Sequence, residues 1–160
     1  MISLSDLRRF KAEARKFSCL TCYDASMAKA MEIAQIDSIL IGDSLGMSIQ
    51  GRDSTLPVTV DDMAYHTAAV RRGNSHAFIM TDLPFMSYAT LNDALQNSRT
   101  VMQAGAQMVK MEGGAWLAET VEVLTRNGIP VCVHLGLTPQ SVHVLGGYKL
   151  QARTREAADQ

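Results

Sequence analysis

Four charged side chains lie at the carboxyl ends of successive apolar segments of this chain. Asp43 follows the segment SILIG, Asp82 follows AFIMT, and Lys110 and Glu112 lie in MVKME. If these segments are parallel strands, their carboxyl ends converge on one rim of the sheet. Hard divalent cations prefer oxygen ligands, so Asp43, Asp82 and Glu112 together predict a site for Mg²⁺.

Two further side chains on this rim suit an anionic substrate. Lys110 and Glu112 are two residues apart, so they share one face of a strand. The Lys110 ammonium could stabilise an enolate as its negative charge develops. His134, near the end of a fifth apolar segment, could donate a hydrogen bond to a substrate carboxylate or act as an acid or base.

Each of these residues also has a common structural interpretation, which is favoured when the residue is taken alone. A single Asp at a strand end most often forms a turn or caps a helix, as we expect for Asp24. Lys110 and Glu112 could be a local ion pair, and His134 a core histidine. Four strand ends that carry Asp43, Asp82, Lys110 with Glu112, and His134 on one rim are much less expected by chance than any one of these residues alone. The combination favours a joint site. The remaining histidines receive no role: His66, His76 and His143.

Apolar segments alternate with helical stretches five times, which is typical of a parallel α/β sheet covered by helices. We predict strands near 17–23, 38–42, 76–82, 108–112 and 130–135. We predict helices near 25–35, 60–72, 91–104 and 115–127, from 154 onward, and over roughly 5–15. Ser5 could cap the first of these helices.

Sequence signals for helix starts support two of these predictions. Thr59 with Asp62, and Thr90 with Asp93, fit a capping pattern of Ser or Thr followed three residues later by an acid. The connection over roughly 47–60 is longer than a typical βα loop, so it is a candidate lid over the rim.

Composition narrows the class of protein. The 160 residues are 47% hydrophobic and 19% charged with a net charge of −1, as expected for one domain spanning 1–160. The sequence lacks a basic stripe for nucleic acid and an apolar stretch or leader for a membrane. We therefore expect a cytoplasmic protein whose partners are small molecules or further subunits.

The three cysteines are an odd number without a disulfide framework, which fits a reducing compartment. Cys19 and Cys22 form a lone C-x-x-C. On a strand, residues three apart face opposite sides, so we predict two small buried strand residues and not a zinc site.

The chain closely resembles the ketopantoate hydroxymethyltransferase family from the first helix to the last residues. The resemblance lies in TCYDASMA, ILIGDSLGM, QGRDSTLPVTVDDMAYHTAAV, DLPFMSY, MVKMEGG and HLGLTPQSVHVLGGYK. It implies a βα barrel of the phosphoenolpyruvate and pyruvate superfamily that assembles as a homodecamer. It also implies transfer of a one-carbon unit from 5,10-methylenetetrahydrofolate to 3-methyl-2-oxobutanoate.

The resemblance also assigns residues to the site. It implies that magnesium is bound at Asp43, Asp82 and Glu112. The ketoacid is expected to contact Asp43, Ser44, Asp82 and Lys110, and we add His134 as a substrate-binding residue from its place on the rim. This agrees with the site argued from the strand ends.

An eight-stranded βα barrel typically needs about 250 residues, whereas five βα units are visible up to Gln160. The chain therefore resembles the front part of a barrel. The resemblance implies a general base that is a glutamate at the end of the sixth strand. We expect this glutamate to lie beyond Gln160, since no residue here matches it, so we assign no catalytic residue. We expect the 160-residue chain alone to be poorly stable or aggregated, and inactive.

Two alternatives stay open. One is another magnesium-dependent ketoacid enzyme on the same barrel, which cleaves or forms a carbon–carbon bond without folate. The other is a noncatalytic remnant, or a binding or oligomerisation module, that keeps the ligands without the chemistry. The string STLPVTVDDMAYH favours the hydroxymethyltransferase.

Overall fold

The apolar segments form the strands of one five-stranded parallel sheet. The computed structural model describes residues 1–158. The strands lie in sequence order across the sheet, and each pairs in parallel with its neighbours. They are β1 (Cys19–Thr21), β2 (Ser38–Ile41), β3 (Phe78–Asp82), β4 (Met108–Glu112) and β5 (Val131–His134).

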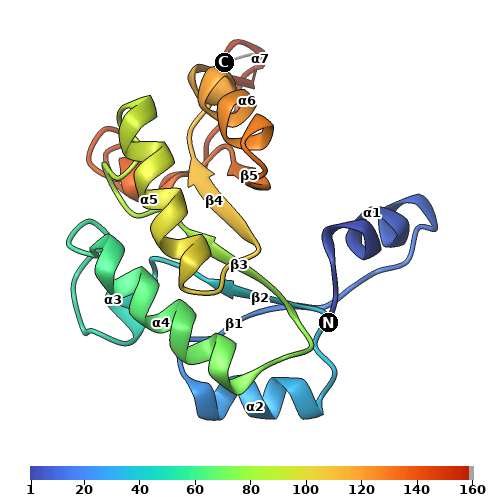
Figure 1. Cartoon of the computed structure of the whole chain (residues 1–160). Coiled ribbons are helices and arrows are strands. Elements are labelled where there is room, and N and C mark those ends of the chain that lie inside the picture. The colour runs from blue at the N-terminus through green and yellow to red at the C-terminus, as the bar shows by residue number, and fades with distance from the viewer. Residues whose placement is uncertain (159–160) are drawn as a thin grey trace.

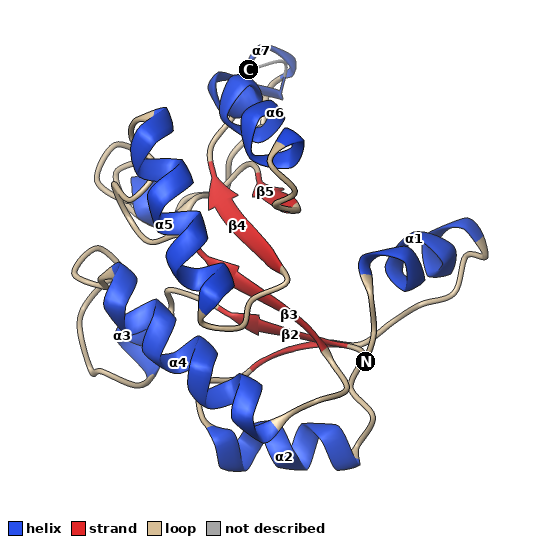
Figure 2. Cartoon of the chain, viewed as in Figure 1, coloured by secondary structure: helices blue, strands red, loops and turns tan. Residues whose placement is uncertain are grey.

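Four crossover helices connect these strands and lie along one face of the sheet (Figure 1). They are α2 (Ala25–Ile33), α4 (Val60–Gly73), α5 (Leu91–Gln103) and α6 (Ala118–Arg126). The other helices are α1 (Leu4–Ala12), α3 (Leu45–Ser48), α7 (Arg155–Ala158) and the 3₁₀ turns η1 (Ala115–Leu117) and η2 (Pro139–Ser141). Figure 2 shows α1 apart from the crossover helices, near the N-terminus. Within residues 1–158, no helix is long and apolar enough to cross a membrane.

The crossover helices bury one stripe each against the sheet. In α4 the buried residues are Met63, Thr67 and Val70, whose spacing of four and three places them on one helix face. The hydroxyl of Thr67 contacts that of Thr81 on β3 at 2.9 Å, so this helix and strand are also linked by a buried hydrogen bond.

Strand register separates the two faces of the sheet. Ile39 pairs with Ile79, and both are fully buried under the helices. On the opposite face, Asp82 pairs with Lys110, and Glu112 with His134. Side chains alternate between faces along a strand. The charged residues of β3, β4 and β5 therefore share the face that no crossover helix covers, which is the interior face of a closed βα barrel.

The structure confirms the predicted strands and crossover helices and corrects several details. Ser3, not Ser5, caps α1, because its side chain and that of Asp6 form a capping box. The predicted helix over 115–127 begins as the 3₁₀ turn η1, and the predicted loop over 47–60 begins inside α3.

The C-terminal end of the chain follows the predicted pattern as far as the structure describes it. The helix predicted from 154 onward is found as α7, which ends at Ala158. Asp159 and Gln160 lie outside the described residues. The expected position of the family's general base, beyond Gln160, is outside the chain whose structure is described, so that expectation stays a prediction.

The prediction of two buried cysteines is wrong for Cys19. Cys22 is buried directly after β1, but Cys19 is exposed. The reason is that β1 lies at the edge of the sheet, and Cys19 faces the side without crossover helices.

The capping box of α4 gives a stability prediction. Thr59 accepts a hydrogen bond from the Asp62 N–H, and Asp62 accepts one from the Thr59 N–H. Thr59→Ala is expected to lower the free energy of unfolding by about 1 kcal/mol, because it leaves a helix-terminal N–H without its partner. Urea denaturation followed by circular dichroism measures this change. Thr59→Ser keeps the hydroxyl and should retain most of the stability, whereas equal losses in both variants would contradict the capping role.

Candidate functional site

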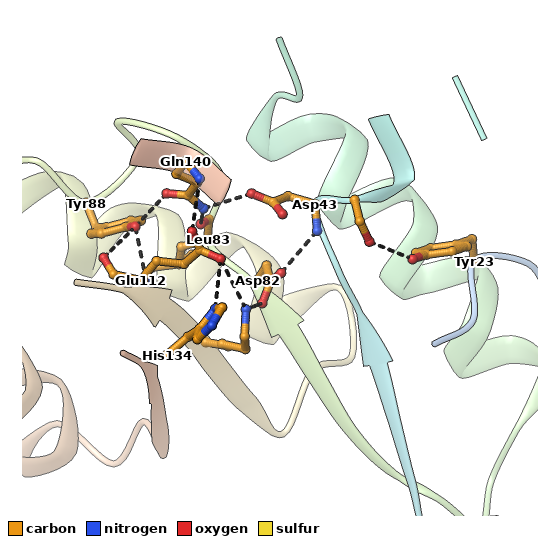
Figure 3. Close-up of polar contacts among 10 residues, drawn as sticks. Tyr23, Asp43, Asp82, Leu83, Tyr88, Glu112, His134 and Gln140 are labelled. Carbon is orange, nitrogen blue, oxygen red and sulfur yellow. Dashed lines mark hydrogen bonds and ion pairs between the residues drawn. The ribbon is translucent and has the colours of Figure 1, made fainter. Parts of the chain in front are cut away.

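The predicted charged residues meet at the carboxyl ends of β2, β3, β4 and β5 (Figure 3). The Lys110 ammonium contacts Asp82 Oδ1 at 2.7 Å and Glu112 Oε1 at 3.8 Å. His134 Nδ1 lies 3.1 Å from the same Glu112 oxygen. The backbone N–H of Asp43 donates to Asp82 Oδ2 at 3.1 Å. One connected network thus contains all three predicted metal ligands.

This network is buried and carries an excess of negative charge. Asp43, Asp82 and Glu112 are each at most 5% exposed. The network contains three carboxyl groups. The cation that forms ion pairs with them is Lys110, and His134 adds a second positive charge when its side chain is protonated. Burial of uncompensated charge is costly, so the protonation of these groups must adjust or a cation must be supplied.

Asp43 shows the consequence of this excess most clearly. Burial, together with the nearby Asp82 and Glu112 carboxylates, raises the pKa of Asp43 to about 7, and the hydrogen bond from Gln140 and the charge of Lys110 partly oppose this rise. Asp43 therefore holds a proton over part of the neutral pH range in the absence of a metal ion.

Lys110 and Asp82 form the buried ion pair of the site. Burial lowers the pKa of Lys110, but the three surrounding carboxylates outweigh it and raise that pKa above its ordinary value. Burial raises the pKa of Asp82, and the contact with Lys110 opposes this effect. The short Nζ–Oδ1 contact keeps a charged ammonium next to the metal-ligand candidates, as an anionic substrate requires.

Sequence reasoning missed two residues of the site, Gln140 and Tyr88. The Gln140 side chain donates to Asp43 Oδ2 at 2.8 Å, and its backbone N–H donates to Glu112 Oε2 at 3.1 Å. The Tyr88 hydroxyl donates to Gln140 Oε1 at 2.5 Å. Tyr88 lies in a loop and Gln140 in the short 3₁₀ turn η2, and in neither does a periodic pattern mark the side chains that point inward.

Ser44 lies beside this network and contacts a different partner. Its hydroxyl is 3.1 Å from the Tyr23 hydroxyl, and His66 Nδ1 lies 2.7 Å from the Tyr23 backbone oxygen. His66, to which the sequence assigned no role, thus supports the loop after β1 and its Tyr23. Tyr23 in turn orients Ser44 at the end of β2.

The donor set fits a hard divalent cation in type and charge. Three carboxyl groups on one rim supply only oxygen ligands, which Mg²⁺ prefers. Within residues 1–158, no group of three or more His, Cys, Asp or Glu side chains is arranged as a metal site. The oxygens of Asp82, Glu112 and Asp43 instead contact Lys110, His134 and Gln140, respectively. Mg²⁺ keeps several waters when it binds, so one or two direct carboxylate ligands satisfy it.

A cavity of about 330 Å³ opens next to this network. Its lining includes Glu112 and Gln140 from the site, together with the apolar side chains Phe85, Met86 and Trp116. The volume is within the range of small-molecule pockets. The rim therefore has room beside it for an organic ligand.

Comparisons with known proteins identify the family of the chain. The profile of the ketopantoate hydroxymethyltransferase family matches residues 1–160. The 3-methyl-2-oxobutanoate hydroxymethyltransferase of Acinetobacter baumannii (strain AYE) is 89% identical over the whole chain. The protein of that name from Psychrobacter sp. (strain PRwf-1) is 65% identical over 99% of the chain. The chain spans only 60% and 58%, respectively, of the lengths of these relatives.

Solved structures at low sequence identity share the fold. Phosphonopyruvate hydrolase, in a complex with oxalate and Mg²⁺, matches with a TM-score of 0.68 at 13% identity, over 92% of this chain and 56% of that one. 2,3-Dimethylmalate lyase, a member of the PEP mutase/isocitrate lyase superfamily, matches with a TM-score of 0.65 at 16% identity, over 99% and 56%. The fold of the described residues is thus that of part of a βα barrel. The match over every residue shows that the chain belongs to the ketopantoate hydroxymethyltransferase family.

Proposed function

We propose that the protein containing this chain transfers a hydroxymethyl group from 5,10-methylenetetrahydrofolate to 3-methyl-2-oxobutanoate. The product is 2-dehydropantoate, an intermediate of pantothenate and coenzyme A biosynthesis. The observation that carries this proposal is the buried network of Asp43, Asp82, Lys110 and Glu112 in a chain that matches the family throughout. The names of the relatives support the reaction.

Asp43, Asp82 and Glu112 would hold a magnesium ion on the rim. When bound, the ion supplies Lewis-acid polarisation of the ketone and carboxylate oxygens, which makes the C3 proton of the ketoacid more acidic. The three carboxyl groups restrict where the ion can sit, because they come from the ends of β2, β3 and β4 and are fixed by buried contacts.

The other side chains of the network would bind and orient the ketoacid. Lys110 places a positive charge beside the metal ligands, where negative charge develops as the C3 proton leaves. His134 is 37% exposed and can turn an N–H toward a substrate carboxylate, and Ser44 offers a hydroxyl at the end of β2. We propose that the group accepting the C3 proton lies outside these 160 residues, beyond Gln160, and that the 160-residue chain alone is inactive.

We also propose a homo-oligomer, with the decamer of the family as the expected size, in the cytoplasm. Large apolar side chains on the surface support association, among them Phe17, Ile33 and Tyr65. Light scattering after gel filtration measures the number of subunits, and a monomer would contradict this part of the proposal.

The reaction is tested in an extended protein, defined as the Acinetobacter baumannii (strain AYE) relative with its matched part replaced by this chain. With Mg²⁺, carbon-13-labelled 5,10-methylenetetrahydrofolate and 3-methyl-2-oxobutanoate, we expect labelled 2-dehydropantoate by NMR. Omitting the folate should abolish the product. Carbon–carbon bond cleavage or formation that needs no folate would instead indicate a different ketoacid enzyme on this barrel.

A further inference from the structure

Gln140 lies in η2, the turn after β5, and its side chain reaches across the rim. The residue is 7% exposed. Its Nε2 donates to Asp43 Oδ2 at 2.8 Å and to the Leu83 backbone oxygen at 3.0 Å. Its own backbone N–H donates to Glu112 Oε2 at 3.1 Å. One residue therefore connects the ends of β2, β3 and β4, as Figure 3 shows.

The surroundings of Gln140 fix the direction of its amide group. A glutamine amide offers two donors on nitrogen and an acceptor on oxygen. Both nitrogen contacts, Asp43 Oδ2 and the Leu83 oxygen, are acceptors, whereas the Tyr88 hydroxyl donates to Oε1. Rotating the amide by half a turn would place oxygen against two acceptors. The side-chain hydrogen bond to Asp43 therefore forms in one amide orientation only.

We propose that Gln140 is a positioning residue, which orients Asp43 and Glu112 for binding a divalent cation. This inference rests on the proposed function, because it takes these two carboxylates as magnesium ligands. Gln140 contacts one oxygen of each carboxylate, so a bound ion would meet the other oxygen of each. On Glu112 that other oxygen, Oε1, also faces His134 and Lys110. Hydrogen-bond partners behind metal ligands typically change metal affinity or activity by about 10- to 100-fold when they are removed.

The first test measures binding of Mn²⁺, as a paramagnetic substitute for Mg²⁺, to the extended protein without substrate. Gln140→Met has a similar length but no amide group. It should weaken Mn²⁺ binding by about 10- to 100-fold in electron paramagnetic resonance titrations. Gln96→Met is the matched control, because Gln96 is exposed on α5 and its side-chain amide donates to the neighbouring Asn92, away from the site. It should bind Mn²⁺ like the unmodified protein.

A second variant tests the same inference without changing Gln140. Tyr88→Phe removes the hydroxyl that donates to Gln140 Oε1, and the other hydrogen bonds of that hydroxyl are to the Glu112 backbone and not to a carboxylate oxygen. It should weaken Mn²⁺ binding less than Gln140→Met does. The double variant should bind like Gln140→Met alone, because Tyr88 acts on the carboxylates through Gln140. Additive losses in the double variant would contradict this order of action.

The outcomes separate this inference from the proposed function. Unchanged Mn²⁺ affinity in a folded Gln140→Met variant overturns the positioning role, while binding and hydroxymethyl transfer by the unmodified protein leave the proposed function intact. Failure of the unmodified extended protein to bind Mn²⁺ or to form 2-dehydropantoate overturns the proposed function, and the inference with it. Circular dichroism of each variant verifies folding. If Gln140→Met does not fold, Tyr88→Phe tests the positioning role in its place: weaker Mn²⁺ binding supports that role, and unchanged binding contradicts it.

Discussion

Lys110→Met is expected to destabilise the extended protein by about 3–5 kcal/mol in the absence of divalent cations, because it leaves buried carboxylates without their cation. The Lys110 ammonium contacts both Asp82 and Glu112, and its side chain is only 13% exposed. Methionine fills a similar volume, so the loss of charge and not of packing dominates. Urea unfolding at about pH 8, where the carboxylates are ionised in the unfolded chain, measures the change.

Two further variants identify charge as the cause. Adding Asp82→Asn to Lys110→Met removes one of the uncompensated carboxylates and should recover a large part of the lost stability. Lys16→Met, at an exposed position outside the site, should leave the unfolding midpoint unchanged. A midpoint for Lys110→Met equal to that of Lys16→Met would show that the buried ion pair does not contribute to stability.

Asp43→Asn is expected to change stability and activity in opposite directions. Without Mg²⁺, the variant should be more stable than the unmodified protein at about pH 8, by at most about 4 kcal/mol at 1.36 kcal/mol per pKa unit. The reason is that burial and neighbouring carboxylates raise the pKa of Asp43 to about 7. Exchange of the C3 proton of 3-methyl-2-oxobutanoate with deuterium should fall by at least about 100-fold, because a ligand for the polarising ion is lost.

The pH dependence of this gain follows from linkage. Between the ordinary pKa of 3.8 and the folded value of about 7, the folded protein keeps the Asp43 proton while the unfolded chain releases it. The contribution of Asp43 to stability is therefore present at low pH and is lost as the pH rises through this window. Asparagine does not titrate, so the advantage of Asp43→Asn should grow from about pH 4 to about pH 7 and then level off. Parallel stability curves for the two proteins across this range would contradict the raised pKa.

Added Mg²⁺ should reverse the order of stability at about pH 8. A cation that binds the folded state alone stabilises it by mass action. The unmodified protein should gain stability with rising Mg²⁺ concentration, and Asp43→Asn should gain much less. Asp43 would then be a carboxyl group that costs stability while the ion is absent and adds stability when the ion binds.

The placement of the charged residues could be predicted from the sequence because it follows from the strands. The apolar segments ending at Asp82 and Glu112 are typical of buried parallel strands, and strands of one parallel sheet end at the same rim. In the structure, the register between β4 and β5 pairs Glu112 with His134, as expected for two residues at the ends of neighbouring strands. The family resemblance added the proposed substrates, which strand periodicity does not indicate.

The loop residues of the site could not be predicted in this way. Gln140 follows Thr138 and Pro139, and this string indicates a turn without indicating that the glutamine points inward. Its partner Asp43 is 97 residues earlier in the chain, and the contact between them depends on how the loop after β5 folds over β2. The same limit explains the wrong prediction for Cys19, because strand propensity does not show which strand lies at the sheet edge.

The most direct test of the shared cation site is a crystal structure of the extended protein with Mn²⁺ and 3-methyl-2-oxobutanoate, analysed by anomalous scattering of the metal. We expect one strong Mn²⁺ peak on the rim, with Asp43, Asp82 and Glu112 around it as direct or water-mediated ligands and Lys110 beside the ketoacid. A peak elsewhere in the molecule, or a ketoacid bound on the rim with no metal next to these three carboxyl groups, would contradict it.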